Sequence, residues 1–150
     1  MPNWCEGTLK VRGTIDNLKN FIQNGLISTT NKQLNIDGDE ASLYVDNIYR
    51  ELYLKGSQRA FCEPDYIEVK VDDPNDYAII TMPFKQAWSI VVDDLYDICK
   101  EFNVDMKIQV FERGMEFSQI IEIVNGKILQ DEKIEYDNWD WDCPFPDLGG

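Results

Sequence analysis

The sequence predicts an α+β fold of the ferredoxin-like class, an antiparallel sheet with two helices on one face. Segments with the two-residue period of strands and segments with the period of helices occur in the order strand, helix, insertion, two strands, helix, three strands. The 150 residues, of which 43% are hydrophobic, suit one domain with its own core. We therefore expect a ferredoxin-like domain over 1–136 with an insertion at about 27–65, a C-terminal hairpin extension, and an acidic aromatic tail over 137–150.

The first predicted strand, Thr8–Arg12, alternates apolar and polar residues, which is typical of a half-buried strand. Thr14 is expected to cap the following helix through its hydroxyl group. Asn24-Gly25 should end that helix, with the glycine in the left-handed conformation that it adopts without steric cost. The apolar residues of the helix share one stripe, formed by Ile15, Leu18, Phe21 and Ile22.

Residues 28–47 are polar and rich in turn formers, so we expect an exposed connection there. The polar residues at 35–39 resemble the start of a calcium loop, but Glu40 replaces the glycine that such a loop requires. No calcium site is therefore predicted. Ile48–Leu54 is expected to form one or two helical turns, with Ile48 and Leu52 on the inner face and Tyr49 and Tyr53 as further candidates for it.

The segments Tyr66–Val71 and Tyr77–Met82 have the period of strands and flank a turn cluster at 72–76, which predicts an antiparallel hairpin. Ser89 is expected to cap the clearest helix of the chain, which runs to about Phe102. The inner face of this helix is formed by Ile90, Val91, Leu95, Ile98, Cys99 and Phe102.

Three strands are predicted in the last third of the chain, at 104–110, 115–124 and 127–136. Arg113-Gly114 makes the first turn between them, and Asn125-Gly126 makes the second. Asn-Gly between two strand patterns is a strong hairpin signal, because both residues tolerate a positive φ.

The formal net charge is −14, from 28 acidic and 14 basic residues. This excess of carboxylates excludes a protein that binds nucleic acid through its phosphates, and also a basic helix on a membrane surface. The chain has no His, so it lacks the commonest general base and the commonest neutral metal ligand. We predict a non-catalytic protein with no cofactor, no direct nucleic-acid binding and no membrane binding.

The four cysteines, Cys5, Cys62, Cys99 and Cys143, are far apart in the chain and form no Cys-x-x-Cys pair. We interpret them as reduced and mostly buried, with a four-cysteine zinc site or disulfides as the alternatives. Met1–Gly13 has no basic start followed by an apolar run, and no apolar stretch approaches the ~20 residues that span a bilayer. These observations predict a protein of the host cell cytoplasm.

The opening run Met1–Gly13, MPNWCEGTLKVRG, resembles the start of the YubB ferredoxin-like family of phage and plasmid proteins, commonly M-P-N-W-C-x-N-x-L-x-V-x-G. Phe84–Ser89 is similar to the family's F-x-T-A-W-S-P-P motif at the second helix. Phe111–Phe117 is similar to its Y-E-P-G-x-x-F turn, and Lys55–Phe61 corresponds to its W-G-T-K-W-N-A segment. The resemblance implies a ferredoxin-like fold and a mobile-element origin, and it implies no activity.

The chain departs from the family pattern in several positions. Gly7 replaces the usual Asn, and Ile90 and Val91 replace the two prolines. Lys55–Phe61 lacks both of the family's tryptophans. The resemblance therefore carries the fold to this chain, but not a ligand pocket.

The tail alternates carboxylates and indoles. Over 131–150 there are seven acidic residues and one lysine. Aromatic side chains can anchor in a partner's pockets, and carboxylates can steer toward a basic surface. Alternatively, the tail folds back and its aromatic residues cover the sheet. The predicted partner-binding residues of the tail and of the second helix are Asp137, Trp139, Asp140, Trp141, Asp142, Asp93, Asp94, Asp97 and Glu101.

Other candidates have simpler structural interpretations. Trp4, Trp88 and Phe117 either line a ligand pocket or anchor the sheet as core aromatics. The aspartates of the second helix either hold a cation or form a solvated face favoured by the helix dipole. Ser89 has no base in any recognisable nucleophile motif.

These observations lead to the hypothesis of a non-catalytic acidic phage or mobile-element protein. It would bind and inhibit a host nucleic-acid-binding defence protein, in the manner of an anti-CRISPR, with carboxylates in place of phosphates. Its partner would be a host protein with a basic surface. The alternative is a protein that sequesters a small ligand or nucleotide signal, with phosphate contacts from Lys10, Arg12, Lys55, Arg59 and Arg113.

Overall fold

The computed structural model describes residues 2–30, 33–57 and 59–150. Met1 of the opening motif and Gln58 of the segment Lys55–Phe61 lie outside the described residues. The strands are β1 (Trp4–Thr14), β2 (Leu26–Ser28), β3 (Ser42–Asp46), β4 (Leu52–Leu54), β5 (Ala60–Cys62), β6 (Tyr66–Lys70), β7 (Tyr77–Ala87), β8 (Asp105–Glu112), β9 (Phe117–Val124) and β10 (Lys127–Glu135). The helices are α1 (Ile15–Gly25), α2 (Val92–Phe102) and α3 (Trp139–Asp142).

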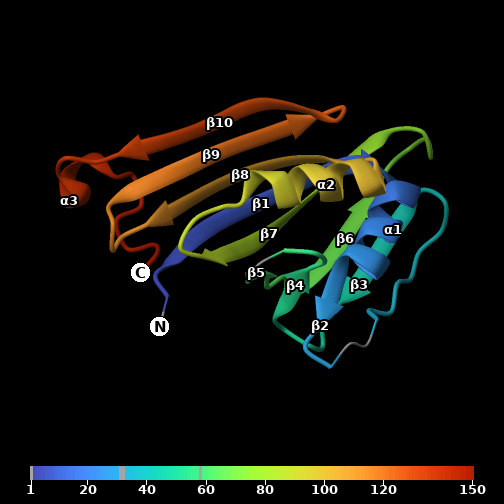
Figure 1. Ribbon diagram of the computed structural model, residues 1–150. Coiled ribbons are helices and arrows are strands. Elements are labelled where there is room, and N and C mark those ends of the chain that lie inside the picture. Colours follow the sequence, from blue (N-terminus) through green and yellow to red (C-terminus); the bar gives the residue numbers. More distant parts are fainter. Residues whose placement is uncertain (1, 31–32, 58) are drawn as a thin grey trace.

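Strands hold far more of the described chain than helices do. Eight of its ten strands form one antiparallel sheet in the order β10-β9-β8-β1-β7-β5-β4-β2, and β3 pairs with β6 in a second, smaller sheet (Figure 1). The predicted ferredoxin-like α+β class is therefore wrong. The strands that were not predicted, β2 to β5, lie in or at the border of the insertion expected at about 27–65.

Two local predictions in this region are also wrong. Residues 28–47 contain β3, in which Leu43 and Val45 are buried, and Leu52–Leu54 forms β4 rather than a helical turn. Of the two residues expected on its inner face, Ile48 is 74% exposed, whereas Leu52 is fully buried as predicted. A strand of three residues spans too few positions to show a period, and its pairing with a neighbouring strand decides its conformation.

The predicted hairpin between Tyr66–Val71 and Tyr77–Met82 does not form as a pair. β6 pairs with β3, and β7 pairs with β1 and β5. The turn residues favour a reversal of the chain but do not select the strand that each flanking segment pairs with. The small sheet contributes Leu43, Val45 and Ile67 to the main core.

The first strand and helix form as predicted. The Thr14 hydroxyl group accepts a hydrogen bond from the Asn17 backbone N–H at 3.3 Å, and the predicted apolar stripe is fully buried. Gly25 ends α1 without the predicted left-handed conformation. A Cβ atom there would lie 3.0 Å from the rings of both Phe21 and Phe102, so the glycine permits close packing of α1 on α2.

The central strand β1 requires glycine at position 7. A Cβ atom on Gly7 would lie 1.9 Å from the backbone oxygen of Gln109 in β8. Any side chain there would force β8 away from β1. Position 7 is one of the departures from the family pattern, and this structure has no room for the family's usual Asn.

The second helix begins later than predicted. α2 starts at Val92, and Ser89 makes no side-chain cap. The backbone N–H of Ile90 donates to the Gln119 side-chain oxygen at 2.8 Å, so β9 holds the entry to the helix. Val91, expected on the inner face, is exposed. The predicted inner residues Ile90, Leu95, Ile98, Cys99 and Phe102 are buried.

The C-terminal hairpin extension is confirmed. β9 and β10 pair across Asn125 and Gly126, which have φ values of 51° and 69°. β10 forms one edge of the large sheet and pairs only with β9 among the described strands. It continues into the tail and α3.

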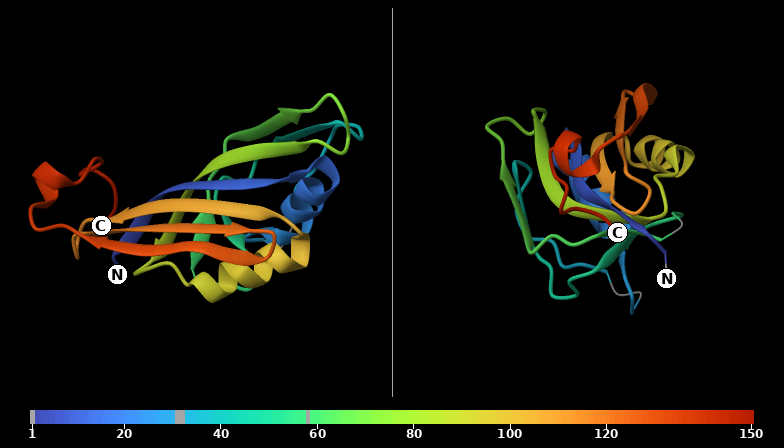
Figure 2. Two further views of the ribbon diagram at one scale, coloured as in Figure 1. Left: turned by 90° about the horizontal axis from the view of Figure 1, so that it is seen from above. Right: turned by 90° about the vertical axis from the view of Figure 1, so that its left-hand side faces the viewer.

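The large sheet has two different faces. The helices α1 and α2 cover one face (Figure 1, Figure 2), and they contact each other through Phe21 and Phe102. Leu9 and Val11 of β1 are fully buried in the core on this side. The alternate residues of β1, such as Thr8, lie on the opposite side, which we call the open face.

The tail folds back over one end of the open face. Phe111 pairs with Glu6 across β8 and β1, so it belongs to the open face, where it is buried in a cluster with Trp139 and Cys143. Figure 1 shows α3 at the same end of the molecule as the start of β1. The backbone N–H of Gly150 donates to the Trp4 carbonyl oxygen at 3.0 Å, which fastens the end of the tail to β1.

Candidate functional site

The two tryptophans of the tail have opposite environments. Trp139 is 5% exposed, and its indole N–H donates to the Pro146 carbonyl oxygen at 2.8 Å. Its ring also packs edge-on against Tyr136, with 5.5 Å between the centroids. The alternative in which the tail folds back is therefore correct for Trp139, which is not available as an exposed anchor.

Trp141 is 86% exposed, and the three predicted aspartates of the tail are exposed beside it. Asn138 caps α3, because its side-chain oxygen accepts a hydrogen bond from the Trp141 backbone N–H at 3.2 Å. Asp142 accepts a hydrogen bond from the Asn138 backbone N–H at 3.1 Å. The tail thus holds Trp141 on a folded turn whose outer side carries Asp137, Asp140 and Asp142.

The predicted carboxylates of α2 are mostly accessible. Asp93 and Asp97 are exposed, and Glu101 is exposed while it pairs with Lys55 at 2.6 Å. Asp94 differs, because one of its oxygens is buried and has no hydrogen-bond partner in the described part of the chain. Asp93, Asp97 and Glu101 are therefore the helix residues best placed to meet a partner.

The strand β10 lies between these two predicted groups and carries exposed carboxylates that are not among the predicted site residues. α2 contacts β10, and β10 leads directly into the tail. Asp131, Glu132 and Glu135 are exposed on β10. The sequence already indicates this exposure. Apolar and polar residues alternate only weakly over 127–136, whereas a strand that is covered on one face shows a clear alternation.

We call the exposed carboxylates of these three elements the acidic surface. Its members are Asp93, Asp97, Glu101, Asp131, Glu132, Glu135, Asp137, Asp140 and Asp142. Two lysines among them lie on aromatic rings: Lys133 is 4.3 Å from the ring centroid of Phe117, and Lys100 is 5.2 Å from that of Tyr96. Their charges are held close to the protein and reduce the negative field only locally.

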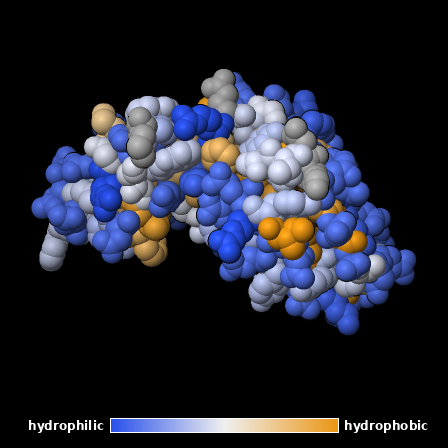
Figure 3. All heavy atoms as spheres, turned by 90° about the horizontal axis from the view of Figure 1, so that it is seen from below, coloured by the Kyte–Doolittle hydropathy of each residue, from blue (hydrophilic) through white to orange (hydrophobic). Residues whose placement is uncertain are grey.

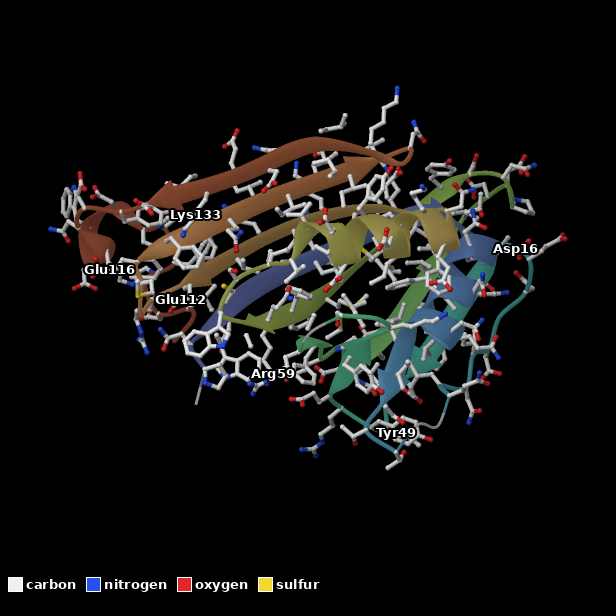
Figure 4. The ribbon with its side chains drawn as sticks, viewed as in Figure 1. Asp16, Tyr49, Arg59, Glu112, Glu116 and Lys133 are labelled. Atoms are coloured by element: carbon white, nitrogen blue, oxygen red, sulfur yellow. The ribbon has the colours of Figure 1, made fainter. Side chains whose placement is uncertain are left out.

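Figure 4 places Lys133, Glu112 and Glu116 at the end of the sheet that carries α3. Glu112 is buried, and its two carboxylate oxygens accept the backbone N–H groups of Gly114 and Met115 at 2.6 and 2.8 Å. Glu112 therefore stabilises the turn between β8 and β9 and is not available to a partner.

The cysteines are free and buried, as predicted. Burial raises the pKa of the Cys5 and Cys99 thiols to about 12, and it also raises the pKa of Cys62. A neutral, buried thiol is a poor nucleophile and a poor metal ligand. Within the described residues, no group of three Cys, Asp or Glu side chains is arranged to hold a metal ion.

The three aromatic candidates have different roles. Trp4 packs edge-on against Phe61 with 5.8 Å between the ring centroids. Phe117 is buried beneath Lys133. Trp88 is 58% exposed, with a φ of 69° that is rare for a bulky residue, in the connection between β7 and α2.

The cations required by the alternative function do not converge. Lys10 and Arg12 share the open face, where Arg12 pairs with a β8 carboxylate at 2.9 Å. Lys55 pairs with α2, and Arg59 stacks on a ring near the start of β1 (Figure 4). Arg113 lies in the turn between β8 and β9. This arrangement does not assemble a phosphate site from the five residues.

The chain matches no family model, no curated protein and no solved structure. Its resemblance to the YubB family stays a prediction. Among the described residues, no helix has the length and apolar character needed to cross a membrane.

Proposed function

We propose that this protein is a non-catalytic phage or mobile-element protein that binds and inhibits a host nucleic-acid-binding defence protein. The acidic surface would occupy the basic site through which that protein, for example a CRISPR nuclease, contacts nucleic acid. One observation supports this proposal most strongly, namely the nine exposed carboxylates that extend from α2 on one face of the large sheet, along its edge strand β10, to the tail over the end of the open face.

The charge is unevenly distributed along the chain. Residues 92–102 and 127–150 hold eleven acidic residues and three lysines, which gives −8 of the total −14. A surface with such a field attracts a basic partner from a distance and competes with a phosphate backbone for the same cations. Binding of this kind needs no catalytic group.

The exposed indole of Trp141 gives the acidic surface an apolar contact. Tryptophan at the centre of an interface often contributes more binding energy than its neighbours, whereas rim charges mainly steer the encounter. Figure 3 shows the molecule from below, largely hydrophilic with small, separate hydrophobic patches. Trp141 and its three neighbouring aspartates are therefore the part of the surface that we expect to confer affinity.

The proposal is tested on nucleic-acid-binding proteins that a host extract yields on a DNA column. The protein is titrated against these proteins while labelled DNA is bound to them, and displacement of the DNA is measured at several salt concentrations. We expect displacement at low salt that weakens at least tenfold toward high salt, because screening shortens the reach of the acidic surface.

A matched pair of variants separates the acidic surface from net charge. D97N/D137N/D140N removes three carboxylates from the acidic surface, and D65N/E68Q/D72N removes three exposed carboxylates from β6 and its flanks. Only the first variant should lose DNA displacement. Equal loss in both variants, or displacement that does not depend on salt, would contradict the proposal.

A further inference from the structure

The open face carries a cavity of about 520 Å³, which is a usual size for a small-ligand site. It lies over β1 and β7, with Glu63 on one side and Leu148 of the tail among its lining residues. We propose that this cavity binds an organic cation, a guanidinium group on an aliphatic chain. The inference does not depend on the proposed function, because none of the residues that line the cavity belongs to the acidic surface.

Glu6 is the carboxylate of the cavity that has no cation. It lies directly opposite Lys85 across β1 and β7, yet the described chain shows no ion pair between them. The one hydrogen bond that the structure gives its carboxylate is a long one, 3.4 Å, from the backbone N–H of Gly149. A half-buried carboxylate with so little compensation favours a positively charged ligand.

Lys85, which lies beside Glu6 in the cavity, is already paired with carboxylates of the chain. Its ammonium group lies 3.0 Å from each of two carboxylates, Glu51 and Glu63, and 5.1 Å from the ring centroid of Trp4. Burial would lower the pKa of Lys85, but the hydrogen bonds to both carboxylates outweigh burial and raise the pKa. The ammonium group of Lys85 is therefore neutralised by Glu51 and Glu63, and the carboxylate of Glu6 is left to pair with a cationic ligand.

The other lining groups suit a guanidinium group better than an ammonium group. Thr8 and Thr81 supply hydroxyl oxygens that can accept additional N–H donors, and Pro83 and Leu148 supply apolar surface for an aliphatic chain. A guanidinium group has five N–H donors in a plane and pairs with a carboxylate through two of them. A phosphate or carboxylate ligand would meet Glu6 and Glu63, while Lys85, which also lines the cavity, is already paired with Glu51 and Glu63.

The tail completes the cavity. Leu148 lines it, and the adjacent Gly149 donates its hydrogen bond to Glu6. A ligand that bridges Glu6 and Leu148 binds only when the tail is folded, so it should stabilise the folded tail by mass action.

The experiment is an NMR titration of the full-length, isotope-labelled chain with acetyl-arginine amide, and with acetyl-citrulline amide as the neutral control of the same shape. We expect saturable amide shifts at Thr8, Thr81 and Gly149 with the arginine compound, and at least tenfold weaker binding of citrulline. Equal binding of both compounds, shifts confined to α2 and β10, or no shifts would overturn the proposal.

Two variants test the role of Glu6. E6Q should weaken binding of acetyl-arginine amide at least tenfold, whereas E116Q, an exposed carboxylate in the turn between β8 and β9, should leave it unchanged. Unchanged melting temperature in E6Q shows that the fold is intact. If E6Q also unfolds the protein, a T8V/T81V variant replaces it, and normal binding in that variant would overturn the proposal.

The source of the guanidinium group is distinguished by a third comparison. Free arginine and a tripeptide with arginine at its centre are titrated in parallel. Tighter binding of the tripeptide assigns the cavity to a side chain of a partner protein, and tighter binding of free arginine assigns it to a small molecule. Either outcome supports a cation site in the cavity. If the acidic surface fails to displace DNA, the proposed function is contradicted, but these two titration results still stand.

Discussion

The molecule contains two hydrophobic clusters that differ in size. The large core lies between the sheet and the helices α1 and α2, where Leu9 and Phe21 have no exposed surface. The small cluster holds Phe111, Trp139 and Cys143 beneath the tail. Because the free energy of burial grows with apolar area, the tail should detach at a lower cost than the sheet unfolds.

The two parts of the proposed binding surface are held by hydrophobic clusters of different size. The carboxylates of α2 sit on an element that the large core holds, and Trp141 sits on an element that the small cluster holds. The first part is fixed, while the second depends on whether the tail is docked.

The largest expected effect is in the large core. Phe21→Ala removes a fully buried ring that packs on Phe102, and we expect the free energy of unfolding to fall by about 3–5 kcal/mol. Urea denaturation followed by circular dichroism measures the change. Tyr66→Ala, which removes a ring that is 61% exposed, is the control and should change stability little. Comparable losses in both variants would contradict the assignment of the core.

The next effect is in the small cluster. Trp139→Ala should cost about 1–3 kcal/mol, because detachment of the tail limits the loss to the free energy of docking. Hydrogen exchange should show lost protection over 137–150, while the amides of β1 and β8 stay protected. Lost protection in β1 as well would show that the two clusters unfold together.

Alkaline pH should weaken the large core. The pKa values of Cys5 and Cys99 are raised from 9.0 to about 12 in the folded chain, so above pH 9 the unfolded state loses protons that the folded state retains. Stability is then fully present well below pH 9 and falls as pH rises, with a slope for each thiol that approaches about 1.4 kcal/mol per pH unit above pH 9. Urea denaturation at pH 8, 9 and 10 measures the slope, which should be shallower in Cys99→Ala. An unchanged slope would exclude the thiol as its cause.

The smallest effect on stability is expected at the exposed tryptophan. Trp141→Ala should change the free energy of unfolding by less than about 0.5 kcal/mol, because its ring is almost wholly in solvent. In the DNA displacement assay the same variant should bind at least tenfold more weakly, as expected for an anchor residue. If this variant displaces DNA normally, Trp141 is not an anchor, and the affinity comes from the carboxylates of α2 and β10.

The sequence by itself determined the elements that are long enough to show a period. α1 and its Thr14 cap, the inner face of α2 apart from Val91, and the hairpin at Asn125-Gly126 follow from residues close together in the chain, and the structure contains them. The gathering of charge in the last third of the chain was also readable, because it depends on composition alone.

Tertiary structure decided the rest. The three-residue strands β2, β4 and β5 are defined by their pairing partners, and two tryptophans in the same local pattern differ because only Trp139 meets Phe111 of β8. Leu148 lines the cavity beside Glu6 because the tail returns to β1, where Gly149 bonds a residue 143 positions away in the chain. No local periodicity encodes such contacts, because their energy depends on which distant surfaces the whole fold brings together.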